Sequence, residues 1–258
     1  MVTDGPDPHP ARWTTTNLVG IPAPVLASTA FNAHPQPLHI AGTLATHPGL
    51  FALLGRSGSA DEARDMFAHY MRLSFGLGPP APGAGAAEGR RWKTSVRQLL
   101  QGWALDANGA AGAVLKGWVE SRFGMVPAYH RAPLARYPSP AWMRYLEEKA
   151  GSRFNNNSIW QQLDLLFEFC QWHLQRFQPL GPGPQATLWR GSTRVEEQLV
   201  AGSLAARRCT VRLNNLVSFS RSRALAGCFG DWVFEARVPL CKLLLVPGLV
   251  DTRVLDGE

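Results

Sequence analysis

The sequence predicts an α+β protein in which helices come first and strands second. Amphipathic patterns at helical spacing run from residue 59 to residue 177, and short runs rich in Val, Leu, Phe and Thr follow from residue 186. The chain is 45% hydrophobic and holds nine Trp and twelve Phe, which suffices for a sizeable core. We expect one continuous globular unit: a mainly helical part, 1–150, and a part, 151–258, with one buried helix and a mostly antiparallel β core.

The helices are marked by their ends. The first fifty residues, rich in Pro, Asn, His and Gly, predict a long loop with short elements. Ser59 precedes Glu62 by three residues, which is a capping pattern, and Gly76 is a stop signal. Ser139 is the expected N-cap of a later helix, and Pro140 stands at its first helical position. We expect helices within 59–76, 90–106, 110–124, 139–151 and 158–177, the last of them central and buried, and a surface linker over 78–89.

The strands are predicted by composition. Four runs after residue 185 are enriched in the β-branched and aromatic residues that favour a pleated surface. They cover residues 186–191, 208–220, 231–240 and 241–248.

Cysteine usage and hydropathy indicate the compartment. Cys170, Cys209, Cys228 and Cys241 lie far apart, with neither a CxxC pair nor a histidine at zinc-ligand spacing. We expect buried thiols in a reducing compartment and no metal site. No apolar run is long enough for a membrane span, and the acidic, Pro-rich N-terminus does not resemble a signal peptide. The sequence therefore predicts a cytoplasmic protein.

The net charge of +7 raises the question of a polyanionic partner. Only four of the 26 basic residues are lysine, and the arginines are scattered along the chain. This distribution argues against a nucleic-acid binder, which is kept as the weaker alternative, and a basic surface that steers an acidic protein partner fits the charge equally well.

Two short motifs on predicted strands suggest a ligand with a pyrophosphate group. They are LWRG, which ends in Arg190 and Gly191, and SFS, which contains Ser218 and Ser220. An arginine at a strand end suits phosphate because its planar fork matches phosphate oxygens. The run GPGPQA at 181–186 fits a dinucleotide fingerprint in letters only, since no strand precedes it and no helix follows it.

With these motifs the chain resembles the arginine-specific ADP-ribosyltransferases of the R-S-E class, and more closely the dinitrogenase reductase ADP-ribosyltransferase family. The resemblance implies an ADP-ribosyltransferase-like fold with NAD as substrate. It spans nearly the whole chain and is carried by STAFNAHPQPLHIAGT, HPGLFALL, GAVLKGWVESRFG, QLDLLFEFCQ, LWRGS and RLNNLVSFSRSRALAGCFGD.

The resemblance also implies roles for individual residues. Arg190 would hold the NAD phosphate and the nicotinamide-side ribose, and Gly191 would receive the nicotinamide carboxamide. Ser218 would orient the catalytic glutamate, with Ser220 as the second serine of that element. Phe229 falls where the family places an aromatic ring near nicotinamide. Taken singly, each has an ordinary structural alternative: a surface ion pair, a strand-edge hydroxyl or a core ring.

An acidic E-x-E element completes the family's site. LDGE resembles its beginning, which aligns Glu258 with the first glutamate, the one associated with the target arginine. The principal catalytic glutamate and its strand are then expected beyond residue 258, so that the C-terminal strand is truncated. In the alternative alignment, Glu258 is the second glutamate and Asp256 the first. Glu235 and Asp231 lie near strands but not at the motif position.

The resemblance implies transfer of ADP-ribose from NAD to a specific arginine of the nitrogenase iron protein, dinitrogenase reductase, which switches off nitrogen fixation. It also implies control by a PII-type signalling protein. The alternative from another class is a catalytically inactive module that binds NAD or a partner, because the second glutamate is not in the sequence.

Overall fold

A computed structural model describes residues 16–77 and 94–250. Within them the protein is α+β, as predicted, and all paired strands run antiparallel. The helices are α1 Ala23–Leu26, α2 Thr29–Ala33, α3 Thr43–Thr46, α4 Pro48–Leu54, α5 Ala60–Phe75, α6 Val96–Leu105, α7 Ala110–Phe123, α8 Pro140–Gly151, α9 Ile159–Phe177 and α10 Arg223–Ala226. The strands are β1 Tyr129–His130, β2 Ala132–Pro133, β3 Gln185–Ser192, β4 Leu199–Ser203, β5 Arg208–Val211 and β6 Trp232–Pro239, with short 3-10 turns η1 Glu196–Gln198, η2 Gly227–Phe229 and η3 Leu240–Lys242.

The predicted ends of α5 are confirmed. Ser59 accepts a hydrogen bond from the Glu62 amide, and Gly76 ends α5 in the left-handed conformation that glycine adopts readily. Helix α6 begins later than its run suggested, at Val96, because the capping box of Ser95 and Gln98 fixes its start. The linker expected at 78–89 lies outside the described residues.

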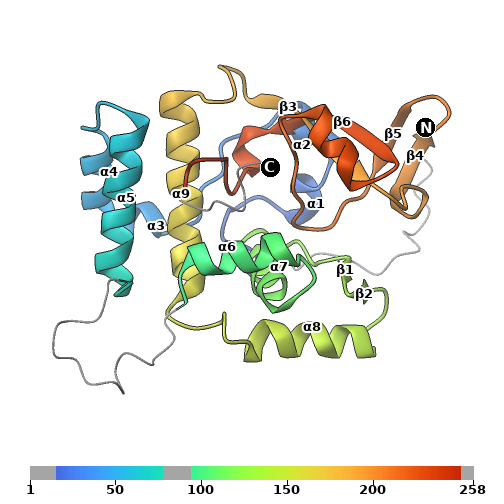
Figure 1. Ribbon diagram of the computed structural model, residues 1–258, viewed down its shortest axis with the longest axis horizontal. Helices are drawn as coiled ribbons and strands as arrows, with labels where there is room; N and C mark the ends of the chain where they lie inside the picture. The colour runs from blue at the N-terminus through green and yellow to red at the C-terminus, as the bar shows by residue number, and fades with distance from the viewer. Residues whose placement is uncertain (1–15, 78–93, 251–258) are drawn as a thin grey trace.

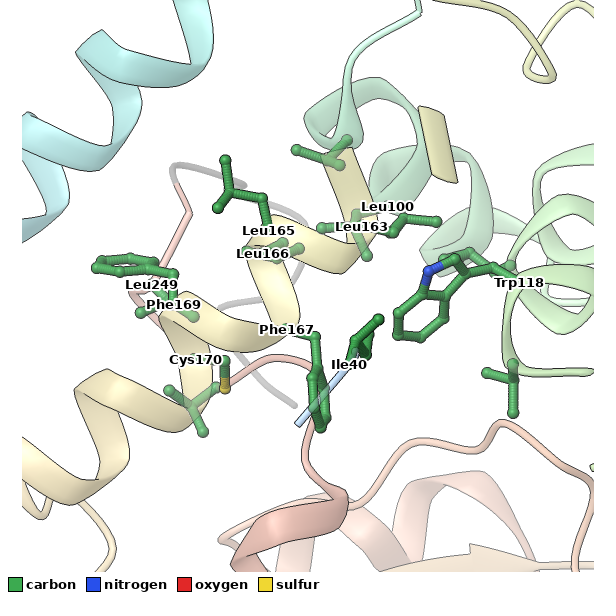
Figure 2. Packing of buried hydrophobic residues seen from close by; sticks show 14 of the residues in the cluster. Ile40, Leu100, Trp118, Leu163, Leu165, Leu166, Phe167, Phe169, Cys170 and Leu249 are labelled. Carbon is green, nitrogen blue, oxygen red and sulfur yellow. The ribbon is translucent and has the colours of Figure 1, made fainter. Parts of the chain in front are cut away.

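Helix α9 runs through the middle of the molecule, with α5 on one side and α6 and α7 on another (Figure 1). Phe167 packs against Trp118 of α7 in the buried cluster that Figure 2 shows from close by. Phe169 stacks on Phe67 of α5, their ring centroids 4.0 Å apart. The prediction of a central buried helix is therefore confirmed.

Helix α9 also buries charged groups, which its apolar pattern did not reveal. Asp164 accepts two hydrogen bonds from Arg122 and one from the Trp118 indole, all at 2.7 Å. Glu168 accepts from the Ile40 amide at 2.6 Å and lies 2.8 Å from the His39 ring nitrogen. Buried carboxylates require such partners, so these residues fix α7 and the N-terminal segment against α9.

The β core is built around β3. All eight residues of β3 pair with β6, from Gln185 opposite Pro239 to Ser192 opposite Trp232. On its other edge, Trp189 and Ser220 exchange both backbone hydrogen bonds, at 2.7 and 2.9 Å. Strand β3 thus lies between β6 and the segment that carries the SFS motif.

Two of the predicted strands were partly or wholly wrong. The run 208–220 is a strand only at β5, and its remainder is irregular up to the bridge at Ser220. The run 241–248 forms no strand. Its start is the turn η3, and the Gln171 amide of α9 donates to the Leu240 and Leu243 carbonyls. A side chain from the helix therefore takes acceptors that a sheet ladder would have used.

The expectation of four buried thiols was half right. Cys170 and Cys241 are buried, but Cys209 and Cys228 are exposed, and none forms a disulfide. Burial raises the pKa of Cys241 above its ordinary value, which keeps its thiol protonated.

The main hydrophobic cluster draws on both parts of the chain, from Leu26 in α1 to Leu249 near the end of the described residues. The predicted boundary at residue 150 remains a prediction. None of the helices formed by the described residues has the length and apolarity that a bilayer crossing requires.

Candidate functional site

Arg190 links the two strand-borne motifs directly. Because side chains alternate along a strand, Arg190 shares the inner face of β3 with the buried residues Leu188 and Ser192. Its Nη1 donates a hydrogen bond of 2.7 Å to the Ser218 carbonyl. The arginine is partly buried and its guanidinium is held beside the serine segment. The structure therefore brings together the R and S residues that the sequence singled out.

Packing alone requires a glycine at position 191, whatever role this residue has towards nicotinamide. A Cβ at this position would lie 2.0 Å from the Ala226 carbonyl oxygen and 3.1 Å from Phe229. No side chain fits in that space, so α10 and η2 can pack onto β3 only over a glycine. Gly191 thus positions the segment that follows the SFS motif.

The serines near residue 220 form a chain of local hydrogen bonds. Ser220 is buried, and its Oγ accepts from the Ser222 amide at 3.0 Å. Ser222 in turn caps α10 by accepting from the Leu225 amide at 3.2 Å. Ser220 therefore has a structural role in turning the chain into α10, whereas Ser218, two residues earlier, is half-buried.

Phe229 lies at the end of η2 with 62% of its surface exposed, so the core alternative for this ring is wrong. Its backbone is close to Gly191, which places it near Arg190. Glu258 and Asp256 lie outside the described residues. The acids Asp231 and Glu235 are both exposed, at the start of β6 and within it.

Two residues that support the site, Asn214 and Asn215, were not predicted from the sequence. Asn215 Nδ2 donates to the Lys116 carbonyl at 3.0 Å and to the Met125 carbonyl at 2.9 Å. Asn214 accepts from the Ala128 amide and donates to the Tyr129 carbonyl, both at 2.9 Å. The segment before Ser218 is therefore anchored to α7 by side chains instead of a sheet ladder. A pair of asparagines inside a predicted strand was the available signal, because asparagine is depleted in strands.

Lys116 extends this anchor into the interior. It is 1% exposed, and its Nζ donates to Asn108 Oδ1 at 2.9 Å and to the Tyr129 carbonyl at 3.0 Å. Burial lowers the pKa of Lys116 to about 8, against the raising influence of Asp106 and Glu148. Tyr129 thus accepts from both Lys116 and Asn214, which joins the helical part to the serine segment.

A mainly apolar cavity of about 140 Å³ opens beside Ser218. Its walls come from α6, α7 and the irregular segments 216–219 and 242–247, and Leu188 of β3 contributes to it. Pockets that enclose drug-sized ligands measure roughly 300–1,000 Å³. The cavity therefore has room for only a part of a dinucleotide. No group of three or more potential metal-ligating residues occurs among residues 16–77 and 94–250.

Comparison with known proteins identifies the family. The family model described as dinitrogenase reductase ADP-ribosyltransferase matches residues 16–258. The chain belongs to this family. It is 45% identical over 255 residues to the NAD(+)--dinitrogen-reductase ADP-D-ribosyltransferase of Rhodospirillum rubrum, which covers 97% of the chain and 91% of that relative. No solved structure matches the chain.

The two motif residues predicted from the sequence are in contact in this structure, since Arg190 donates to the Ser218 carbonyl. The resemblance on which the sequence prediction rested is confirmed at the level of the family. The roles of the individual site residues remain proposals.

Proposed function

We propose that the protein transfers ADP-ribose from NAD to a specific arginine of dinitrogenase reductase and thereby switches off nitrogen fixation. The observation that carries this proposal is the direct contact between Arg190 and the Ser218 segment. The name of the 45% identical relative specifies NAD and dinitrogen reductase, which supports the same donor and acceptor here.

The reaction exchanges one bond at the ribose. The bond between C1′ and the nicotinamide nitrogen breaks, and nicotinamide leaves with the electron pair as a neutral base. A guanidinium nitrogen of the target arginine forms the new bond to C1′ and gives up a proton to a carboxylate. Positive charge builds on the ribose in the transition state, so a carboxylate near the 2′-OH stabilises it more than the ground state.

The described residues are suited to hold NAD. Arg190 presents planar N–H donors of the kind that bind pyrophosphate oxygens, and Ser218 borders the adjacent apolar cavity. The exposed ring of Phe229 is available for stacking on nicotinamide. In this proposal Ser218 orients the catalytic carboxylate, and Glu258 is the acid associated with the target arginine.

The proposal includes an ADP-ribosyltransferase-like fold, in which β3 and the Ser218 segment lie side by side in the NAD-binding core. It also includes a cytoplasmic location and control by a PII-type protein, both of which follow from the family resemblance alone. A catalytically inactive binding module is less well supported, because the relative with 45% identity over nearly the whole chain is named as a transferase.

The deciding experiment is mass spectrometry of dinitrogenase reductase after incubation with NAD and the protein. We expect one arginine to carry ADP-ribose, and we expect Arg190→Ala to reduce the rate about tenfold to a hundredfold. This range corresponds to the roughly 1.5–3 kcal/mol of a hydrogen bond to a charged group.

The matched control is Arg237→Ala, which removes an exposed arginine from the neighbouring strand β6. It should leave the rate within about twofold. NAD binding without any modified arginine would favour the inactive module, and an equal loss in both variants would refute the role of Arg190.

A further inference from the structure

The hairpin of β4 and β5 differs from the rest of the β core in its exposure. Every residue of β4 is exposed, including Leu199 at 36% and Val200 at 53%. The register shifts between Leu199 and Ala201, so Val200 is left outside the pairing as a bulge. An isolated two-stranded hairpin is only marginally stable in water, and exposed apolar residues on it indicate a surface that a partner covers.

The hairpin also begins a long stretch of uniform charge. Residues 199–230 contain five arginines and no aspartate or glutamate, which accounts for most of the net charge of +7. Two of these arginines, Arg207 and Arg208, are exposed at the turn of the hairpin. Arg207 has a φ of +54°, in the left-handed region. A cluster of one sign on an exposed turn attracts a partner of the opposite sign.

The base of the hairpin is fixed to the end of the strand that carries Arg190. Ser192 ends β3, and Gln198 Nε2 lies 3.5 Å from its Oγ. The Arg212 amide donates to the Gln198 carbonyl at 2.7 Å and closes the base. Opposite Ser192 lies Trp232, 40% exposed. In Figure 1 the hairpin extends from the β3 and β6 pair away from α9.

The hairpin carries its turn away from its base. The strand from Leu199 to Ser203 rises about 3.4 Å per residue, which puts the turn roughly 14 Å beyond the base. The turn is therefore placed to meet a partner that reaches beyond the base of the hairpin. When the target arginine belongs to a protein, the protein surface around that arginine can contact the hairpin.

We propose that the β4–β5 hairpin, Leu199–Val211, is a docking surface for an acidic face of the protein substrate. Arg207 and Arg208 supply the charge, and Leu199 and Val200 supply apolar contact. This inference rests on the proposed function, because it assumes that the acceptor is a protein. It adds the surface that holds this acceptor and the chemistry of the face that binds there.

The test compares two acceptors, dinitrogenase reductase and a small guanidine such as arginine methyl ester. The variant is Arg207→Asn with Arg208→Gln, since asparagine tolerates the left-handed backbone of residue 207. We expect KM for dinitrogenase reductase to rise about tenfold or more, as electrostatic steering changes association by roughly 10 to 1,000-fold. Transfer to the small guanidine and KM for NAD should stay within about twofold.

The matched control is Arg56→Gln with Arg72→Gln. Both arginines are exposed near α5, at the end of the molecule remote from the hairpin, and their loss changes the net charge equally. The control should keep the wild-type KM for dinitrogenase reductase. Raising the salt concentration should weaken transfer to dinitrogenase reductase by the wild type more than by the hairpin variant, because salt screens exposed charges.

Four outcomes would overturn the docking proposal. The hairpin variant could keep the wild-type KM for dinitrogenase reductase, or it could lose transfer to both acceptors equally. In the third outcome, the wild type binds duplex DNA in a salt-sensitive way and the hairpin variant does not, while the variant still modifies dinitrogenase reductase normally. This would show that the hairpin arginines bind nucleic acid. Wild type that modifies the small guanidine but not dinitrogenase reductase would refute the proposed substrate itself, and the docking proposal with it.

Discussion

The helical part and the β part of this protein are held together in different ways. Around α9, side chains such as Phe167 and Trp118 are at most 1% exposed and pack ring against ring. Around β3, support comes from backbone pairing with β6 and from side-chain hydrogen bonds such as that of Arg190 to the Ser218 carbonyl. The hairpin β4–β5 has little buried surface. The helical part is thus held mainly by apolar packing, and the groups proposed for chemistry lie where hydrogen bonds supply much of the support.

This separation has a physical reason. A ligand site needs polar groups that remain accessible, and such groups cannot be surrounded by a close-packed apolar core. The β part is instead fixed to the helical part by side chains that reach across, such as Gln171 to the Leu240 carbonyl. Three substitutions or conditions test this comparison, and they are ordered here by the size of the expected effect.

The largest effect is expected from Phe167→Ala. Truncation of a buried phenylalanine costs about 3–5 kcal/mol, because transfer energy is lost and a cavity remains. At roughly 2–4 °C per kcal/mol for a chain of this size, the melting temperature should fall by about 6–20 °C, as followed by circular dichroism. The matched variant is Phe229→Ala, whose ring is 62% exposed and should cost less than about 1 kcal/mol. Equal losses in the two variants would contradict the proposed separation.

An intermediate effect, on activity instead of stability, is expected from Asn215→Asp. The substitution puts a carboxylate where Nδ2 donates to the Lys116 and Met125 carbonyls, and two donor interactions are lost. At about 1–3 kcal/mol for unsatisfied buried groups, kcat for transfer should fall roughly tenfold, with KM for NAD changed less.

The matched variant is Asn155→Asp, at an exposed position whose Nδ2 donates to the Ala150 carbonyl at 3.2 Å. It should keep the wild-type kcat. If Asn215→Asp lowered the melting temperature strongly but left kcat of the folded enzyme unchanged, Asn215 would be structural only, and its link to Ser218 would be refuted.

The smallest effect is expected from titration of Lys116. Burial lowers the pKa of Lys116 from 10.5 to about 8, so the folded state loses this proton at lower pH than the unfolded chain. Below pH 8 both states are charged, and the folded state bears the full cost of burying the charge. As pH rises from 8 towards 10.5, the unfolded chain binds more protons than the folded one, and this group's contribution to stability increases.

Denaturant unfolding at pH 7.5 and pH 9.5 measures this contribution against Lys116→Met, which cannot titrate. One pKa unit corresponds to about 1.4 kcal/mol. From pH 7.5 to pH 9.5, the free energy of unfolding of the wild type should therefore rise by roughly 1–2 kcal/mol relative to that of the variant. Parallel stability changes in both proteins would show that the Lys116 proton is not linked to folding.

Local sequence determined the helices and much of the β core. Caps such as Ser59 and Ser139 act within one turn of chain, and the strands β3 and β6 follow from composition, so neighbouring residues were sufficient evidence. The motif residues Arg190 and Ser218 were also visible, because residue type and family resemblance do not depend on distance in space.

Tertiary structure decided what lies between those elements. The Gln171 amide binds the Leu240 and Leu243 carbonyls where the sequence predicted a strand, and the Ala226 carbonyl explains why residue 191 is glycine. Asn215 reaches α7 across 99 residues of sequence to fix the segment before Ser218. Each is a contact between groups far apart in the chain, and a pattern of neighbouring residues carries no information about which distant atoms will meet.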